Sequence, residues 1–410
     1  MMSSAPLAPV RRRRVFYIPG YDPFHPRRYR ELYRSEGREQ ARLSGYALDL
    51  KARTGAEGYG WHVTAEIDGQ PVETEFEVLV WSDIVRDSMA TSILATYLQL
   101  IRTAWIYIAS GALWRLMRLR QGPVIAALYP VFLLLVQLLV ALGLGAGLAW
   151  VLGQLGTGPM IWAAQILVGL GAAALLLRGF KRLDNKLFAY YLMHDYAHSA
   201  ALRGQNAPEL EARIARFTKT LSTALAAGEV EEVLVVGHSS GAHIGVSVLA
   251  DLLHQGLPDN CPTLSFLSLG QVVPMVAFLP HADRLRRDLR EMSEQRDIPW
   301  FDVTAPGDGC AFALCDPVAV SGVARAAQRW PVVFSAAFTQ SLSPARWQEL
   351  KRRYFRLHFQ YLCAFDAPKD YDYFQITAGP LTLGERYKDR APSPSRLTKP
   401  VNRYTSVEPR

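Results

Sequence analysis

Residues 231–243, EEVLVVGHSSGAH, carry the strongest signal for the architecture of this chain. A short apolar run favours a buried strand, and it leads into Gly-x-Ser-x-Gly at residues 237–241, after which a helix is expected at once. A turn this tight strains the backbone of its central serine, and side chains at Gly237 or Gly241 would collide there. The sequence therefore predicts that Ser239 presents its hydroxyl at the tip of a strand, above a helix N-terminus that favours developing negative charge.

Strands and helices alternate around this turn. The expected strands are Val15–Ile18, Ala47–Arg53, Trp61–Ile67, Val72–Trp81, Glu232–Val236, Thr263–Leu269 and Trp300–Thr304, with an Asp-Gly hairpin turn at residues 68–69. The expected helices are Arg27–Leu43, Lys181–Leu202, Pro208–Ala227, Gly241–His254, Asp283–Gln295 and Pro344 to about Cys363, the last begun by Ser343 as N-cap. The alternation predicts an α/β fold with a mostly parallel sheet and helices on both of its faces.

Two long uncharged segments interrupt this pattern. Val124–Leu152 exceeds the roughly 20 apolar residues that span a bilayer, and Met160–Leu177 is at the short end of the range. Basic residues flank both outer ends, so by the positive-inside rule both ends face the cytoplasm. Close approach of the two helices is expected at four glycines: Gly143, Gly147, Gly169 and Gly171. We expect an inserted transmembrane helical hairpin in a bacterial inner membrane, with a buried soluble hairpin as the alternative.

Composition and net charge limit the classes of partner that this chain is expected to bind. Half of the 410 residues are hydrophobic and a fifth are charged, which excludes a disordered chain. The net charge is +8, and the basic clusters at 11–14 and 115–120 fit either a solvated surface or attraction to anionic lipid. No nucleic-acid module accompanies them, so nucleic acid is not an expected partner.

The apolar segment Thr91–Met117 fits either an interfacial helix or a buried core helix. Four cysteines without a C-x-x-C pair indicate reduced thiols.

The strand, Gly-x-Ser-x-Gly turn and helix at 231–243 resemble the nucleophile elbow of the α/β-hydrolase superfamily. The resemblance implies an α/β-hydrolase-like sheet, a serine nucleophile at Ser239 and an oxyanion hole whose first donor is the backbone N–H of Ser240. The second donor comes from a loop after an earlier strand. Residues 14–23 are similar to that loop, although Pro19 replaces the family's histidine, and they imply the Tyr21 N–H as donor.

The same resemblance fixes the order of a catalytic triad as serine, acid, histidine. Four histidines follow Ser239: His243, His254, His281 and His358. The first two lie on the helix that leaves the turn, and His281 precedes the strand expected to carry the acid. His358 therefore remains as the candidate base, although an aromatic neighbourhood is also typical of a packed histidine.

The acid is expected just beyond the strand Trp300–Thr304. Asp308 lies in the following loop, where its carboxylate could hold the tautomer of the imidazole. Asp302 is the alternative, because aspartate within a strand is disfavoured unless it has a task. Asp316 precedes a proline and is typical of a turn residue.

These expectations give a membrane-anchored serine hydrolase that acts on a lipid or long-chain acyl ester without a metal or organic cofactor. A membrane metalloprotease built on His194 and His198 is one alternative, since two histidines at i, i+4 are half of a zinc motif. A non-catalytic scaffold with a hydrolase-like fold is the other. The expected organisation is a flexible basic tail (1–14), an N-terminal part with the oxyanion loop (15–122), the hairpin (123–178), the core (179–384) and a disordered tail (385–410).

Overall fold

The computed structural model describes residues 9–53, 58–89 and 92–408. The chain divides into two compact units. The sheet unit comprises residues 1–86, 112–123 and 202–410, and the hairpin unit comprises residues 87–111 and 124–201.

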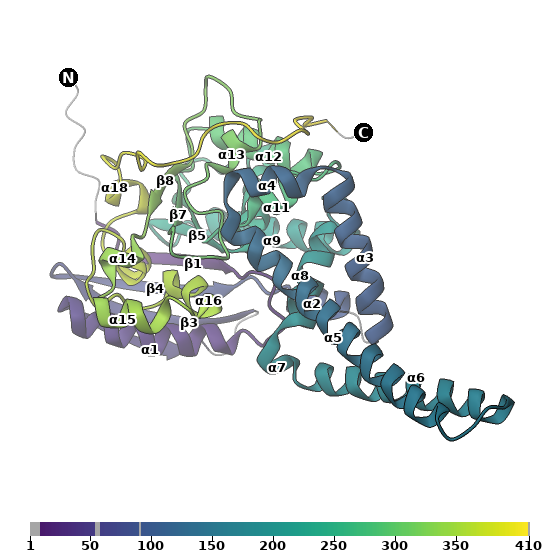
Figure 1. Cartoon of the computed structure of the whole chain (residues 1–410). Helices are drawn as coiled ribbons and strands as arrows, with labels where there is room; N and C mark the ends of the chain where they lie inside the picture. Colours follow the sequence, from purple (N-terminus) through teal and green to yellow (C-terminus); the bar gives the residue numbers. More distant parts are fainter. Residues whose placement is uncertain (1–8, 54–57, 90–91, 409–410) are drawn as a thin grey trace. The chain divides into compact units, whose positions relative to one another are not determined.

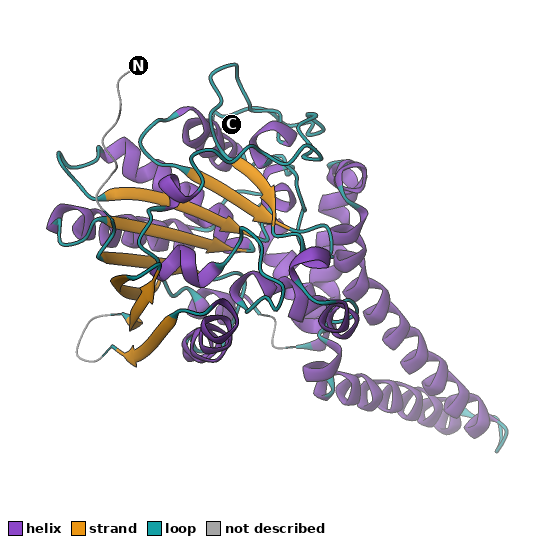
Figure 2. Ribbon diagram, turned by 90° about the vertical axis from the view of Figure 1, so that its left-hand side faces the viewer, coloured by secondary structure: helices purple, strands orange, loops and turns teal. Residues whose placement is uncertain are grey.

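The sheet unit is organised around a mixed sheet, whose strands are orange in Figure 2. The strand order is β2-β3-β4-β1-β5-β6-β7-β8. Its strands are β1 (Arg12–Ile18), β2 (Ala47–Ala52), β3 (Tyr59–Ile67), β4 (Gln70–Val78), β5 (Glu232–His238), β6 (Thr263–Leu269), β7 (Trp300–Thr304) and β8 (Val332–Ser335). β1 pairs in parallel with β4 and β5, and the parallel pairing continues to β8, whereas β2, β3 and β4 are joined antiparallel. The predicted α/β class with a mostly parallel sheet is confirmed.

Helices cover both faces of this sheet (Figure 1). The longer helices of the unit are α1 (Arg27–Ser44), α4 (Ala112–Leu119), α9 (Pro208–Ala227), α10 (Ser240–Gln255) and α12 (Asp283–Glu294). The shorter ones are α11 (Val273–Ala277), α13 (Pro317–Val320), α14 (Phe338–Ser341), α15 (Pro344–Leu350), α16 (Tyr354–His358), η1 (Gln360–Leu362), α17 (Tyr373–Ala378) and α18 (Leu383–Arg386). α2 (Ser82–Ser88) leads to the hairpin unit.

The two faces are separated by the alternation of side chains along each strand. Gly245 of α10 lies against Phe266 of β6. The next residue, Leu267, joins a core that includes Tyr33 of α1 and Phe374 of α17. Because successive side chains of a strand point to opposite faces, α10 and the pair α1 and α17 cover opposite sides of the sheet. All seven residues of β5 are buried, which accounts for its continuous apolar sequence.

The predicted flexible basic tail was wrong over its last residues. β1 begins at Arg12, and Arg13 is fully buried in an ion pair with Glu232, with a nitrogen–oxygen distance of 2.6 Å. Arg13 also donates hydrogen bonds to the carbonyls of Gly379 and Leu381. The basic cluster suggested a tail because the acid that pairs with Arg13 is 219 positions away and cannot be recognised from the local sequence. Residues 1–8 lie outside the described residues.

The predicted disordered C-terminal tail was also wrong. Through residue 408, its backbone is bonded to the sheet unit: Ser393 N–H donates to Val333 O, and Leu397 N–H donates to Leu314 O. The side-chain amide of Asn402 donates to three carbonyls, those of Ala277, Ser321 and Tyr404. A composition rich in Pro, Ser and Arg does not reveal such pairing, because it depends on distant backbone groups.

Several predicted helices are divided. The segment expected from Pro344 to about Cys363 forms α15, α16 and η1, with Ser343 capping α15 as predicted. The segment Thr91–Met117 gives α3 (Ile93–Ala109) and α4, with Gly111 left-handed between them at φ 73°. Strand β8, of four residues, was not predicted. The hairpin at Asp68-Gly69 is confirmed, since both residues have positive φ.

The hairpin unit contains α3, most of α5 (Gln121–Gly153), α6 (Pro159–Arg182), α7 (Asp184–Leu187) and α8 (Ala189–Ala200). α5 and α6 are long and apolar enough to cross a membrane by length and composition. They meet at Gly145 and Gly169, where a Cβ on Gly145 would lie 2.4 Å from the Gly169 carbonyl oxygen. Of the four predicted contact glycines, Gly169 takes part; the other three, Gly143, Gly147 and Gly171, have no non-local atoms within 4 Å of an added Cβ.

Candidate active site

Loops that carry the candidate residues begin at one edge of the sheet. The carboxyl ends of β1, β5, β6 and β7 meet there, because these strands are parallel neighbours. β1 is followed by residues 19–21, β5 by Ser239, β6 by Gly270, and β7 by the loop that contains Asp308. The carboxyl edge of a parallel sheet is the usual place for a ligand site in α/β proteins.

Ser239 occupies the strained position expected from its sequence. Its backbone angles are φ 57° and ψ −122°, and α10 begins at the next residue. Its N–H donates to the carbonyl of Leu269 at the end of β6, with a nitrogen–oxygen distance of 2.9 Å. A non-glycine residue with such angles costs on the order of 1–3 kcal/mol, and that cost persists where the surroundings fix the conformation. The side chain is half-buried.

The flanking glycines are required by close backbone contacts. A Cβ on Gly241 would lie 2.0 Å from the carbonyl oxygen of Ile18, and a Cβ on Gly237 would lie 2.7 Å from the carbonyl oxygen of Gly241. Both distances are too short for any side chain. The predicted steric role of the two glycines is therefore confirmed, and Gly241 also seats α10 against the end of β1.

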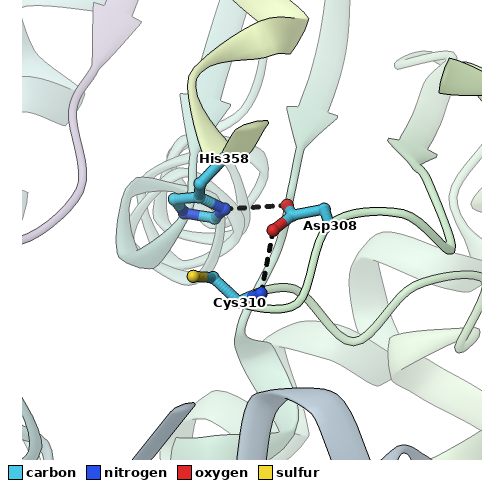
Figure 3. A group of neighbouring side chains, drawn as sticks. All are labelled: Asp308, Cys310 and His358. Atoms are coloured by element: carbon cyan, nitrogen blue, oxygen red, sulfur yellow. Dashed lines mark hydrogen bonds and ion pairs between the residues drawn. The ribbon is translucent and has the colours of Figure 1, made fainter. Parts of the chain in front are cut away.

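Asp308 and His358 form a buried pair, drawn in Figure 3. The Nδ1 atom of His358 lies 2.8 Å from Oδ2 of Asp308. Asp308 also accepts hydrogen bonds from the Cys310 N–H at 2.8 Å and from the Tyr361 hydroxyl at 3.1 Å. Since an ionised carboxylate only accepts, Nδ1 donates in this bond, and in the neutral form of the ring the lone pair is then on Nε2.

The environment keeps Asp308 ionised. Burial alone would raise its pKa, but the neighbouring His358 and the hydrogen bonds from Cys310 and Tyr361 outweigh burial and hold the pKa below its usual value. A permanent carboxylate at this position can orient the imidazole and stabilise its protonated form.

Two contacts place His358 against residues close to Ser239 in the backbone. His238, which directly precedes Ser239, has Nε2 2.9 Å from the His358 carbonyl oxygen, and the two rings are 4.9 Å apart between centroids. A carbonyl only accepts, so Nε2 of His238 is the donor. The second contact is with Gly270, where an added Cβ would lie 3.2 Å from Cε1 of His358. Gly270 directly follows Leu269, whose carbonyl accepts the hydrogen bond from the Ser239 N–H.

Two residues of this arrangement were missed by sequence reasoning. Burial is the main cause, and the nearby His358 a smaller one, that lowers the pKa of His238 to about 3, so this ring stays neutral. Its hydrogen bond to the His358 carbonyl holds the backbone of that residue. Tyr361 accepts from the Ala305 N–H at 2.9 Å and donates to Asp308, and thereby ties the β7 loop to η1. The position of His238 inside Gly-x-Ser-x-Gly is the one sequence signal that could have indicated it; nothing local marks Tyr361.

The loop after β1 reaches the serine. A Cβ on Gly20 would lie 2.9 Å from the Ser239 Cβ and 3.3 Å from its Oγ. Tyr21, the next residue, is buried with its ring near Trp81, whose indole N–H donates to the Pro19 carbonyl at 2.9 Å. Ser240 is the first residue of α10, so its N–H is one of those without an acceptor inside the helix. The residues of both predicted oxyanion donors therefore lie next to this contact in the chain: Tyr21 follows Gly20, and Ser240 follows Ser239.

The other candidate acids lie elsewhere. Asp302 is fully buried within β7, where it accepts a hydrogen bond from the Ser268 hydroxyl at 2.7 Å. Asp316 caps α13 through the N–H groups of Val318 and Ala319. The pairing with His358 thus favours Asp308 over Asp302.

The histidines of the metalloprotease alternative lie on α8. His194 is buried, and its Nδ1 donates to the side-chain oxygen of Gln99 at 2.8 Å. Burial, with a smaller effect of Lys181, lowers the pKa of His194 to about 4. In the described part of the chain, neither His194 nor His198 belongs to a group of three or more residues placed to hold a metal ion. The group that does so is Asp308, Cys310 and His358.

No family model, curated protein or solved structure matches this chain.

Proposed function

We propose that this protein is a membrane-anchored serine hydrolase of the α/β-hydrolase kind that cleaves acyl esters. The observation that supports the proposal is Ser239, held at positive φ at the end of β5, together with the Asp308–His358 pair, whose imidazole lies against His238 and Gly270. Strain on a hydroxyl-bearing residue, a buried acid–imidazole pair and a helix N-terminus at one sheet edge are what acyl transfer needs.

The proposed reaction begins at His358. Its Nε2 takes the proton of Ser239 as Oγ attacks the ester carbonyl, and Asp308 stabilises the imidazolium that forms. The N–H groups of Ser240 and Tyr21 hold the oxyanion of the tetrahedral intermediate. The imidazolium then protonates the departing alcohol, which leaves an acyl-enzyme. Water, activated by the same imidazole, releases the acid and restores the serine.

The hairpin unit supports a lipid environment and, by location, a lipid or long-chain acyl ester as substrate. α5 has 33 residues and α6 has 24, lengths of about 50 and 36 Å at 1.5 Å per residue. α3 adds an exposed apolar stripe at heptad-like spacing, formed by Leu94, Leu98, Ile101, Trp105 and Ile108. Exposed apolar surface of this extent is rarely left in water.

The metalloprotease alternative is not favoured, because among the described residues neither His194 nor His198 belongs to a group of three side chains placed to hold a metal ion. The other alternative, a non-catalytic scaffold, predicts neither ester hydrolysis nor reaction with an active-site probe.

Under the proposal, purified protein in detergent should hydrolyse p-nitrophenyl esters and react with a fluorophosphonate probe. Ser239→Ala should lower the rate by at least 10³-fold, as removal of a serine nucleophile typically does. Ser247→Ala, which changes a serine of α10 whose hydroxyl donates to Asp288, is the matched control and should keep both properties. Equal rates for wild type and Ser239→Ala would contradict the proposal.

A further inference from the structure

The proposed reaction leaves one reactive group at this site without a role, the thiol of Cys310. Cys310 lies two residues after Asp308 in the loop that follows β7, and its half-buried side chain faces the acid–imidazole pair (Figure 3). One carboxylate oxygen of Asp308, Sγ of Cys310 and one ring nitrogen of His358 all lie within 4.8 Å of one another. The Cys310 N–H bond to Asp308 Oδ1 fixes the loop in this conformation.

We propose that Asp308, Cys310 and His358 form a binding site for a divalent ion of the zinc class, and that the bound ion reversibly blocks the hydrolase. The blocking part rests on the proposed function; the binding part does not. Thiolate, imidazole and carboxylate are the ligands that zinc takes in proteins, at about 2.0–2.3 Å from the metal. Ligand atoms around a tetrahedral ion are then roughly 3.3–3.6 Å apart. Since the present separations are at most 4.8 Å, shifts on the order of 1 Å in the three side chains reach that geometry.

Ion binding and catalysis compete for the same lone pair. The ion takes up the Cys310 thiolate, so one proton per site is released from the thiol to solvent. It also binds one ring nitrogen of His358, and the other nitrogen then carries the imidazole proton. Whichever nitrogen binds, His358 has no free lone pair left for the proton of Ser239. A solvent water completes the tetrahedral coordination.

The thiol also sets the selectivity of the site. Sulfur is a soft ligand that favours zinc and its chemical relatives, whereas magnesium and calcium prefer oxygen ligands. We therefore expect zinc, cobalt(II) and cadmium to bind and to inhibit. Magnesium and calcium at the same concentration should do neither.

The binding test uses cobalt(II) and the full-length protein in detergent. Titration should produce a thiolate-to-cobalt charge-transfer band in the near ultraviolet that saturates at one ion per chain, and zinc should displace it. In Cys310→Ser the band should be absent and the zinc affinity at least tenfold lower. Cys261→Ser is the matched control, because Cys261 is, like Cys310, a half-buried cysteine outside any disulfide, and it lies outside the cluster. It should keep the band.

The inhibition test compares each variant with its own rate in EDTA. Zinc should suppress ester hydrolysis by wild type and by Cys261→Ser, and EDTA should restore it, whereas Cys310→Ser should lose this sensitivity. A wild type without the band, or a Cys310→Ser variant with an unchanged band and affinity, would overturn the site. A band with no effect of zinc on hydrolysis would overturn the block. If Ser239 proves not to be a nucleophile, there is no hydrolysis to inhibit, but the cobalt measurement still decides the binding.

Discussion

At the scale of single residues, partners decide what each carboxylate does. Asp302 and Asp308 are both fully buried, six positions apart, yet their protonation is opposite. Asp308 accepts hydrogen bonds from three donors, on His358, Cys310 and Tyr361, and stays ionised. Asp302 faces one hydroxyl, and burial, with a small further effect of Asp316, raises its pKa to about 8. The acid of the proposed triad is therefore distinguished by its environment.

Asp308→Asn should lower kcat roughly 10³- to 10⁴-fold, because an amide no longer fixes the imidazole tautomer. Asp302→Asn should change kcat by less than about threefold, because a neutral amide resembles the protonated acid that the core holds. Both variants should be compared by steady-state ester hydrolysis after circular dichroism has shown that they fold. A larger loss in Asp302→Asn than in Asp308→Asn would show that the acid has been misassigned.

Asp302 should also make stability depend on pH. In the unfolded chain it ionises near pH 4, whereas in the folded protein it stays protonated up to about pH 8. Its contribution to the free energy of unfolding is therefore complete below pH 4, declines as pH rises toward 8, and changes no further above that. The decline should amount to a few kcal/mol.

Denaturant unfolding of wild type and of Asp302→Asn across pH 4–9 measures this contribution as a difference. The advantage of wild type over the variant should shrink with rising pH, since asparagine does not titrate. A constant difference across that range would mean that Asp302 is ionised in the folded protein.

The turn at Ser239 and its two glycines could be predicted from local sequence, and the pairing of Asp308 with His358 from the triad order that the family resemblance implies. The sequence did not predict His238 or Tyr361, because their roles depend on contacts with residues 120 and 53 positions away. Side-chain partners at such separations leave no periodicity or motif in the sequence.

At the scale of secondary-structure elements, the sequence predicted types better than boundaries. The apolar run of β5 and the long helices α5 and α6 came out as expected. Two of the divisions within predicted helices lie where the chain turns left-handed, at Gly111 between α3 and α4 and at Phe188 between α7 and α8, with φ 73° and 55°. A bulky residue gives no sign of such a turn, because tertiary packing imposes it.

The packing of α5 against α6 gives a prediction for the hairpin. Gly145→Ala should weaken it, because the new Cβ would lie 2.4 Å from the Gly169 carbonyl oxygen and would push the helices apart. Overpacking of this kind costs about 1–3 kcal/mol. Gly147→Ala is the control, since an added Cβ meets no non-local atoms within 4 Å there.

Melting temperatures of the two variants in the same detergent provide the comparison. Gly145→Ala should melt several degrees below wild type. Gly147→Ala should melt at or slightly above the wild-type temperature, because alanine favours helix over glycine. Equal melting temperatures for all three proteins would contradict the close helix contact.

At the scale of the whole molecule, the chain combines an α/β sheet unit with a unit that holds two helices able to span a membrane. The number of arginines overstates the exposed basic surface, because some of them, such as Arg13 and Arg286, are buried and paired with acids within the sheet unit. Composition could reveal the apolar segments but not which cations pair internally.

Membrane insertion gives a prediction for the full chain. The protein should resist alkaline carbonate extraction and should require detergent. A cysteine introduced near Gly156, between α5 and α6, should react with an impermeant thiol reagent added to intact cells, because the loop would face outside. A cysteine near Lys186 should not react. Recovery of the intact protein in the carbonate supernatant would contradict the anchor, and equal reaction at both positions would contradict the orientation.

The most direct test of the central claim is to locate the fluorophosphonate adduct on the protein by peptide mass spectrometry. A serine activated by His358 and strained at the end of β5 should react far faster than other hydroxyls. We predict one adduct per chain, on Ser239, and its loss in His358→Ala. An unmodified Ser239 peptide in a protein that hydrolyses esters, or an adduct on another residue, would contradict the account.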